Sequence, residues 1–336
     1  MTLSELQQVN AIIGLSHNIP GWPSTLADHK YSLDRIELKF KVRDPQRPGY
    51  SIIINPDLLF VSDQRNSSLI VELKSGSFHE HDLRQMDNLV GLKPLELIRD
   101  GAVTLQHISP AHISSHKISV MIVVNQEHLA RFLVEFTSVG HKASLVSIDE
   151  KLIQSKHGDL TDNGLDREFK NGINIENSFM PTKFVRVLPT TNNTYEVIKH
   201  IVETVKVLWV NNERSVTPQR IATKLFNDIW GLFDSDAQEQ FVNLAKETLK
   251  DMRQTEFNRY LAPVPGKPNE WRLLNLPETE VRNRTLAQKT FSKVTQEYKW
   301  RKLNNTEYKG GKHIDHPDFG DVAEGFYPDN DEDEQT

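Results

Sequence analysis

Cysteine is absent from the 336 residues, so neither disulfide bonds nor zinc sites built on thiolates are available to this chain. Apolar runs long enough to cross a bilayer are also absent, and the first 30 or so residues lack the pattern of a secretory signal. We therefore expect a globular protein of the cytoplasm that has no membrane partner. The chain length predicts two domains followed by a tail.

Basic residues are missing from residues 315–336, which hold nine Asp or Glu. The whole chain carries −6, so residues 1–314 carry +3. A run of one charge sign predicts an acidic, disordered tail. Before it, residues 281–314 hold nine Lys or Arg against two Glu, with aromatic residues among them. This basic segment is either a nucleic-acid contact or a solvated helix whose aromatic side chains pack on the preceding domain. Its candidate contact residues are Lys293, Lys299, Trp300, Arg301 and Lys302.

Two apolar stretches in the N-terminal half predict neighbouring strands. Residues 51–61 are rich in Ile and Leu and are interrupted by Pro56-Asp57, and residues 68–74 are β-branched and apolar. Polar, turn-forming residues separate the two stretches, so we expect an antiparallel pair.

The second stretch ends in Glu72-Leu73-Lys74. Side chains alternate along a strand, so Glu72 and Lys74 share one face, and pairing with the first stretch could bring Asp57 close to Glu72. Two carboxylates are hard oxygen ligands that suit Mg²⁺, and the lysine can meet charge that develops on a phosphodiester. The alternative for Glu72 and Lys74 is the solvated end of an edge strand.

These residues resemble the signature of the PD-(D/E)XK nuclease superfamily, in which Pro-Asp is followed by an acidic residue, any residue and Lys. A helical glutamine, here Gln85, resembles one that the RecB-type branch carries, although Leu89 stands where that branch has tyrosine. The alternative for Gln85 is an ordinary polar helix residue. The resemblance implies catalytic roles for Asp57, Glu72, Lys74 and Gln85, with Mg²⁺ (or Mn²⁺) held by Asp57, Glu72 and the carbonyl of Leu73.

Superfamily members commonly add an acidic residue on a helix ahead of the sheet. Glu5, in the predicted helix 3–14, is one candidate, and Glu37, in a strand expected over residues 35–42, is another. The alternative for Glu5 is a surface glutamate, because the helix dipole favours negative charge in the first turn of a helix.

The element order predicts an α/β fold of the restriction-endonuclease-like αβββαβ type in residues 1–150. After the motif, a helix (82–99), a strand (118–124), a second helix (126–139) and a strand (143–148) are expected. Turn signals predict a connector over residues 151–193, with a short strand at 184–188.

Residues 194–280 predict three helices and then a hairpin, the order of a winged helix. A plain helical bundle with a hairpin lid is the alternative reading.

The sequence as a whole predicts a Mg²⁺-dependent endonuclease that hydrolyses DNA, with RNA as an alternative substrate. A nuclease core joined to a winged-helix-like domain resembles, in outline, nucleases of restriction and anti-phage defence or of mobile elements. The weak charge outside the tail predicts targeting by a protein partner or by homo-oligomerisation. The competing hypothesis is an inactive nuclease-fold protein that binds nucleic acid or assembles a complex.

Overall fold

A computed structural model of the chain provides the structure. It divides into two compact units, Met1–Pro277 and Glu278–Thr336, and each is described by itself. The acidic tail and residues 310–314 of the basic segment lie outside the described residues. The structure describes residues 3–43, 51–74, 80–99, 110–139, 142–181, 184–189, 194–276 and 281–309.

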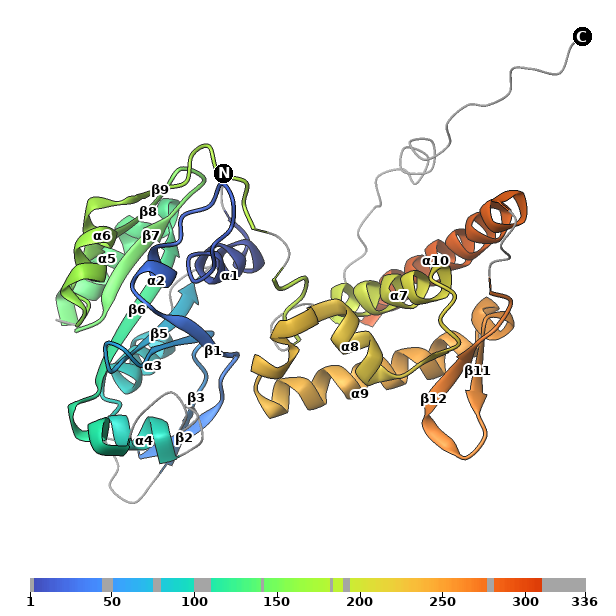
Figure 1. The fold of residues 1–336 in the computed structure, drawn as a ribbon, viewed down its shortest axis with the longest axis horizontal. Coiled ribbons are helices and arrows are strands. Elements are labelled where there is room, and N and C mark those ends of the chain that lie inside the picture. The colour runs from blue at the N-terminus through green and yellow to red at the C-terminus, as the bar shows by residue number, and fades with distance from the viewer. Residues whose placement is uncertain are drawn as a thin grey trace, which may run out of the picture. The chain divides into compact units, whose positions relative to one another are not determined.

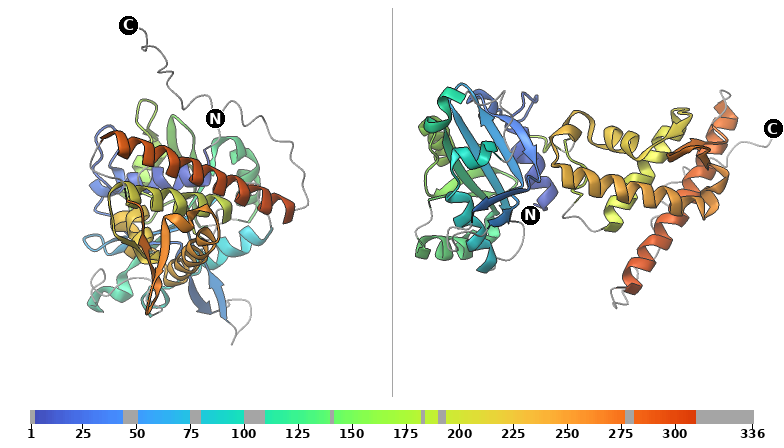
Figure 2. Two further views of the ribbon diagram at one scale, coloured as in Figure 1. Left: turned by 90° about the vertical axis from the view of Figure 1, so that its right-hand side faces the viewer. Right: turned by 90° about the horizontal axis from the view of Figure 1, so that it is seen from below.

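A mixed, seven-stranded sheet forms the N-terminal part of the first unit, in the order β1-β4-β5-β6-β7-β8-β9 (Figures 1 and 2). The β5–β6 and β6–β7 pairs are parallel, and the other pairs are antiparallel. Parallel strands are normally buried on both faces, and β5 and β6 are accordingly buried along most of their length. The strands are β1 (Ser32–Ile36), β4 (Leu58–Ser62), β5 (Ser67–Lys74), β6 (Lys117–Asn125), β7 (Ser144–Ile148), β8 (Leu152–His157) and β9 (Ile173–Asn174).

Helices α3 (Glu80–Val90) and α5 (Leu129–Val139) place apolar side chains against one face of this sheet. Met86 of α3 and Phe132 and Phe136 of α5 join a single buried cluster with the strands. Burial of each such side chain is worth about 1.5–3 kcal/mol. The other helices here are α1 (Glu5–Gly14), α2 (Thr25–Asp28), α4 (Pro94–Arg99) and α6 (Asn163–Asn171), with short 3₁₀ turns η1 (Pro110–Ser115) and η2 (Gln126–His128).

The strand expected over residues 35–42 is split in two. Glu37 has a φ of 51°, which ends β1, and the chain resumes as β2 (Phe40–Arg43). β2 pairs with β3 (Ser51–Ile54) in a separate two-stranded sheet (Figure 1). The sequence pattern missed this break because Glu37 is not a residue type that favours the left-handed region.

The stretch expected to be an irregular connector begins with regular structure between residues 152 and 174. Strands β8 and β9 extend the sheet, and helix α6 lies between them in the chain. The turn-forming residues that predicted a loop here lie at the ends of elements. Asp162 caps the start of α6, and Gly172, with a φ of 90°, ends the helix. The strand expected at 184–188 is not formed. Instead, the side chain of Asn10 bonds both backbone groups of Val185, at 2.8 and 2.9 Å, in the place of a neighbouring strand.

Residues 194–276 contain the expected helices and hairpin, and also a short strand that the sequence did not predict. β10 (Ser215–Val216) pairs with β12, which gives a three-stranded sheet in the order β10-β12-β11. The main elements are α7 (Thr194–Val210), α8 (Pro218–Phe226), α9 (Ser235–Arg253), β11 (Leu261–Val264) and β12 (Lys267–Leu273), with 3₁₀ turns η3 (Asn227–Leu232) and η4 (Glu256–Arg259). The described residues of the second unit form helix α10 (Val281–Lys309).

Within the described ranges, no helix is both long enough and apolar enough to cross a membrane.

Candidate functional site

The β4–β5 hairpin aligns the two parts of the sequence motif. Leu58 lies opposite Val71, so one further step along each strand sets Asp57 opposite Glu72. Opposed residues of an antiparallel pair have side chains on the same face. The two carboxyl groups therefore belong to one edge of the sheet, as the sequence predicted.

Asp57 is fixed against the second strand by a hydrogen bond. Its Oδ2 accepts from the backbone N–H of Leu73 at 2.6 Å, which ties the Pro-Asp turn to the middle residue of the Glu-Leu-Lys motif. Lys74 completes the group, because its Nζ lies 2.9 Å from Oε1 of Glu72. The side chain of Glu72 is 5% exposed and that of Lys74 is 16% exposed, so this ion pair is partly shielded from solvent.

The pKa of Asp57 is raised well above its usual range. Burial is the main cause, and the nearby Glu72 carboxylate adds to it, while the N–H of Leu73 lowers the pKa. The charge of Glu5 raises the pKa further, and the ammonium of Lys74 lowers it. The carboxylates around Asp57 therefore outnumber the cations beside it. Such an environment favours the binding of a proton or a metal cation.

Gln85, on α3, contacts the chain that leads into the motif. Its Nε2 donates to the backbone carbonyl of Asn55 at 3.3 Å, two residues before Asp57. This contact positions the turn that carries Asp57.

The two further acidic candidates also lie near Asp57. Glu5 stands in the first turn of α1, whose start is fixed by a capping box between Ser4 and Gln7, and its charge acts on Asp57. The backbone N–H of Glu37 donates to the carbonyl of Asp57 at 2.7 Å. The sequence left these two candidates open.

Hard carboxylate oxygens beside a lysine fit Mg²⁺ or Mn²⁺ better than a soft metal. In the described part of the chain, no three His, Cys, Asp or Glu side chains are grouped so as to hold a metal ion. Asp57 and Glu72 are two carboxylates, and Mg²⁺ commonly takes one or two from a protein.

The basic candidates of α10 differ in exposure. Lys293 is exposed and Trp300 is 47% exposed, whereas Lys299 is buried and Arg301 is half-buried. The Nζ of Lys302 lies 5.7 Å from the centre of the Tyr298 ring, and the ring is itself buried. The five residues therefore do not share one exposed surface.

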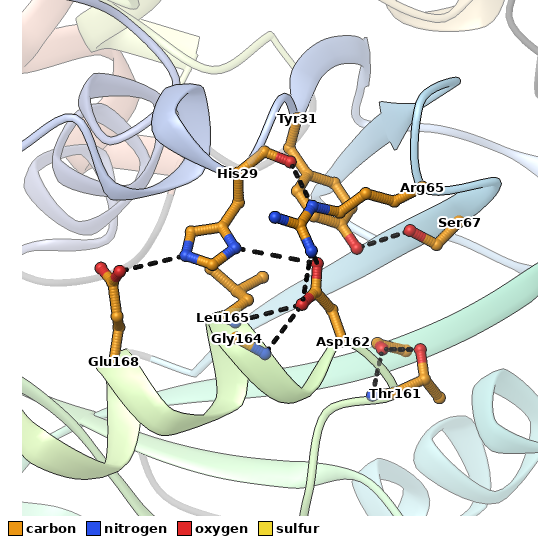
Figure 3. A network of polar contacts seen from close by, with 10 residues as sticks. His29, Tyr31, Arg65, Ser67, Thr161, Asp162, Gly164, Leu165 and Glu168 are labelled. Carbon is orange, nitrogen blue, oxygen red and sulfur yellow. Dashed lines mark hydrogen bonds and ion pairs between the residues drawn. The ribbon is translucent and has the colours of Figure 1, made fainter.

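A second polar cluster joins the β4–β5 turn to α6 (Figure 3). Asp162 caps α6 by accepting from the N–H groups of Gly164 and Leu165 at 3.0 and 3.2 Å. Its Oδ2 lies 3.1 Å from Nη1 of Arg65, and His29 lies between Asp162 and Glu168, with its Nε2 3.1 Å from the latter. No local sequence pattern indicates this cluster, because its members come from three distant segments.

We expect the Asp162→Ala variant to be less stable than the wild type by about 2 kcal/mol, because it loses a helix cap and leaves Arg65 and His29 without this carboxylate. Urea unfolding measures the difference. Asp159→Ala, in the same loop, is the matched control, since Asp159 is exposed and its ion pair with Lys170 lies at the surface. Equal unfolding midpoints for Asp162→Ala and the wild type would contradict a stabilising role.

A third group, also missed from the sequence, has the outline of a Ser-His-Asn triad. Nε2 of His116 lies 2.9 Å from Oγ of Ser68, and its Nδ1 lies 3.0 Å from Oδ1 of Asn66. Ser68 is fully buried and His116 is 5% exposed, so no substrate can reach the hydroxyl. Burial also lowers the pKa of His116 to about 4. The group is structural.

Comparison with known proteins places the sheet and the candidate site in one family. The matching family model is described as the MJECL32 domain and covers residues 4–185, which include every strand of the seven-stranded sheet. No curated protein and no solved structure matched the chain. Because the matched residues make up more than half of its length, the protein belongs to the MJECL32 domain family.

Proposed function

We propose that this protein is a metal-dependent nuclease of the PD-(D/E)XK type that hydrolyses phosphodiester bonds of DNA. The observation that carries the proposal is the placement of Asp57, Glu72 and Lys74 at one edge of the sheet. Asp57 accepts from the backbone N–H of Leu73 at 2.6 Å, and Lys74 pairs with Glu72 at 2.9 Å. The order of α1, β1, β4, β5, α3 and β6, with β6 parallel to β5, supports the αβββαβ core that the motif requires.

In this proposal, Asp57, Glu72 and the carbonyl of Leu73 hold Mg²⁺, or alternatively Mn²⁺. When bound, the metal polarises the phosphodiester and lowers the pKa of water. Lys74 orients the attacking water and offsets the negative charge that develops on the phosphate. Gln85 keeps the Asp57 turn in place through Asn55, and Glu5 is the candidate for a further acidic group.

The helices and hairpin of residues 194–276 suit a role in directing the nuclease to its substrate better than a role in recognising a base sequence. A cavity of about 700 Å³ between the end of α9 and the β11–β12 hairpin is lined by Lys250, Arg253 and Lys267. Exposed acidic residues on α9 disfavour insertion of this helix into a major groove. We therefore assign a winged-helix-like role in phosphate or partner contact, and infer that a partner or a second copy directs the nuclease in the cytoplasm.

The second candidate function is an inactive nuclease fold that binds nucleic acid or assembles a complex. The ion pair of Lys74 with Glu72 favours it, because the ammonium, 2.9 Å from Oε1, occupies a carboxylate oxygen that a metal ion would need.

A cleavage assay separates the two functions. Plasmid DNA, single-stranded DNA and RNA are incubated with the full chain and Mg²⁺, Mn²⁺, Ca²⁺ or EDTA. The nuclease proposal expects cleavage with Mg²⁺ or Mn²⁺, little with Ca²⁺, and none with EDTA or in the Lys74→Ala variant. If cleavage survives EDTA or persists in Lys74→Ala, the activity belongs to a contaminant. If all substrates stay intact under every condition, the result supports the inactive protein.

A further inference from the structure

The β2–β3 hairpin leads directly into the candidate site. β3 ends at Ile54, and only Asn55 and Pro56 separate it from Asp57. The Gln85 contact to the carbonyl of Asn55 holds this junction against α3. The hairpin is therefore fixed beside the carboxylate pair, although it belongs to a sheet of its own.

The two faces of the hairpin differ. Val42 and Ile54 are 4% and 2% exposed and join the buried cluster beneath the hairpin. On the other face, Lys41 lies opposite Ile53 in the strand register, and residues opposed in this way have neighbouring side chains. Ile53 is 62% exposed and Lys41 is also exposed. A cation and a bare branched apolar side chain thus stand next to each other on the solvent side.

Lys39 and Lys41, at the start of β2, differ in their ion-pair partners. Lys39, just before β2, lies 3.1 Å from Asp236 and is already paired. Lys41 forms no ion pair with any residue that the structure describes. A polyanion approaching Asp57 and Glu72 meets repulsion from the two carboxylates, so a nearby cation helps to hold it there.

Nucleic acid fits this surface better than an apolar protein partner does. Two-stranded ribbons enter the grooves of duplex DNA, where basic side chains contact phosphates and exposed Ile or Leu side chains wedge between base steps. A lone apolar side chain flanked by a lysine offers too little apolar area for a stable protein interface.

We propose that the outer face of the β2–β3 hairpin, defined by Lys41 and Ile53, contacts duplex DNA next to the bond that is cut. Lys41 binds a backbone phosphate, and Ile53 contacts the groove wall or a base step. This inference rests on the proposed nuclease function and adds a substrate surface to it.

The test measures binding separately from cleavage. Lys41→Gln, Ile53→Ser and the double variant are compared in an Asp57→Asn background by fluorescence anisotropy with a labelled duplex, across a salt series. We expect the double variant to raise Kd by about tenfold, and Lys41→Gln to reduce the slope of log Kd against log salt by about one. In the active protein, the same changes should raise KM and leave kcat at saturation largely unaltered.

Matched controls are Val134→Ser and Lys117→Gln. Val134 on α5 is 68% exposed, close to the exposure of Ile53, and Lys117 is an exposed lysine at the start of β6. Both should leave Kd unchanged. A Kd unaffected by the double variant overturns the inference, as does an altered oligomeric state without loss of DNA affinity, which would mark the face as a contact between copies.

The outcomes also separate this inference from the proposed function. If the wild type binds duplex through Lys41 and Ile53 but cleaves nothing with any metal, the hairpin surface stands and the nuclease activity falls. If the wild type cleaves and the hairpin variants bind normally, the activity stands and the surface falls. A wild type that neither binds nor cleaves overturns both.

Discussion

The Asp57→Asn variant should lose cleavage activity by about a thousandfold while it remains folded. On the proposed mechanism, the substitution removes a carboxylate that would hold the metal, and several kcal/mol of transition-state stabilisation correspond to roughly a thousandfold in rate. Asparagine has nearly the same shape as aspartate and retains an oxygen that can accept from the N–H of Leu73. In the wild type, the nitrogen of Leu73 lies 2.6 Å from Oδ2 of Asp57. The change also removes the repulsion from Glu72, so the metal-free fold should unfold at no lower urea concentration.

Asp57 is a cleaner test than Glu72. Glu72 pairs with Lys74 at 2.9 Å in a shielded position, so its substitution leaves a lysine that is 16% exposed without that carboxylate. A loss of activity in a Glu72 variant could then reflect misfolding.

Asp63→Asn, in the exposed turn of the same hairpin, is the matched control and should keep full activity. Cleavage by Asp57→Asn at the wild-type rate would remove Asp57 from the site.

Local sequence signals predicted β5, β6 and the antiparallel partner of β5, but the stretch 51–61, expected as one interrupted strand, forms β3 and β4 in separate sheets. The apolar content of β5 and β6 and the polar turn before β5 are properties of neighbouring residues, and the register that places Asp57 opposite Glu72 follows from them. The role of Gln85 remained open because it depends on a backbone carbonyl thirty residues away.

The errors have a common physical cause, which is that contacts distant in sequence override local preference. Asn10 satisfies the backbone of Val185 and so replaces a strand, and the N–H of Glu37 bonds to Asp57 where a single strand was expected. Glycine and asparagine around α6 read as loop residues although they lie at its ends.

The Ser68–His116–Asn66 group could have been found from one signal. β5 and β6 are parallel and begin side by side, with Ser67 opposite Lys117. Polar residues at the starts of two adjacent parallel strands are therefore brought together, and Ser68 and His116 satisfy this condition.

Acid should destabilise this protein through His116. Its pKa is about 4 in the folded state against an ordinary value of 6.5, because burial disfavours the charged ring, and its partners Ser68 and Asn66 are neutral. The neutral ring accepts from the Ser68 hydroxyl through Nε2 and donates from Nδ1 to Oδ1 of Asn66, and protonation places a second N–H and a positive charge in this buried position. Between these two pKa values the unfolded chain binds a proton that the folded chain does not.

The contribution of His116 to stability is therefore complete above about pH 6.5 and falls as the pH drops, by about 3 kcal/mol in total near pH 4. Urea unfolding is measured at a series of pH values for the wild type and for His116→Gln. The difference between the two proteins isolates the contribution of His116 from that of the other titrating groups. At pH 7 the variant should be less stable, because it loses the two hydrogen bonds of the ring. As the pH falls, the wild type should lose stability faster, so the gap between the two proteins should close. If the two curves run parallel from pH 7 to pH 4.5, then His116 either titrates normally in the folded state or is not buried in solution.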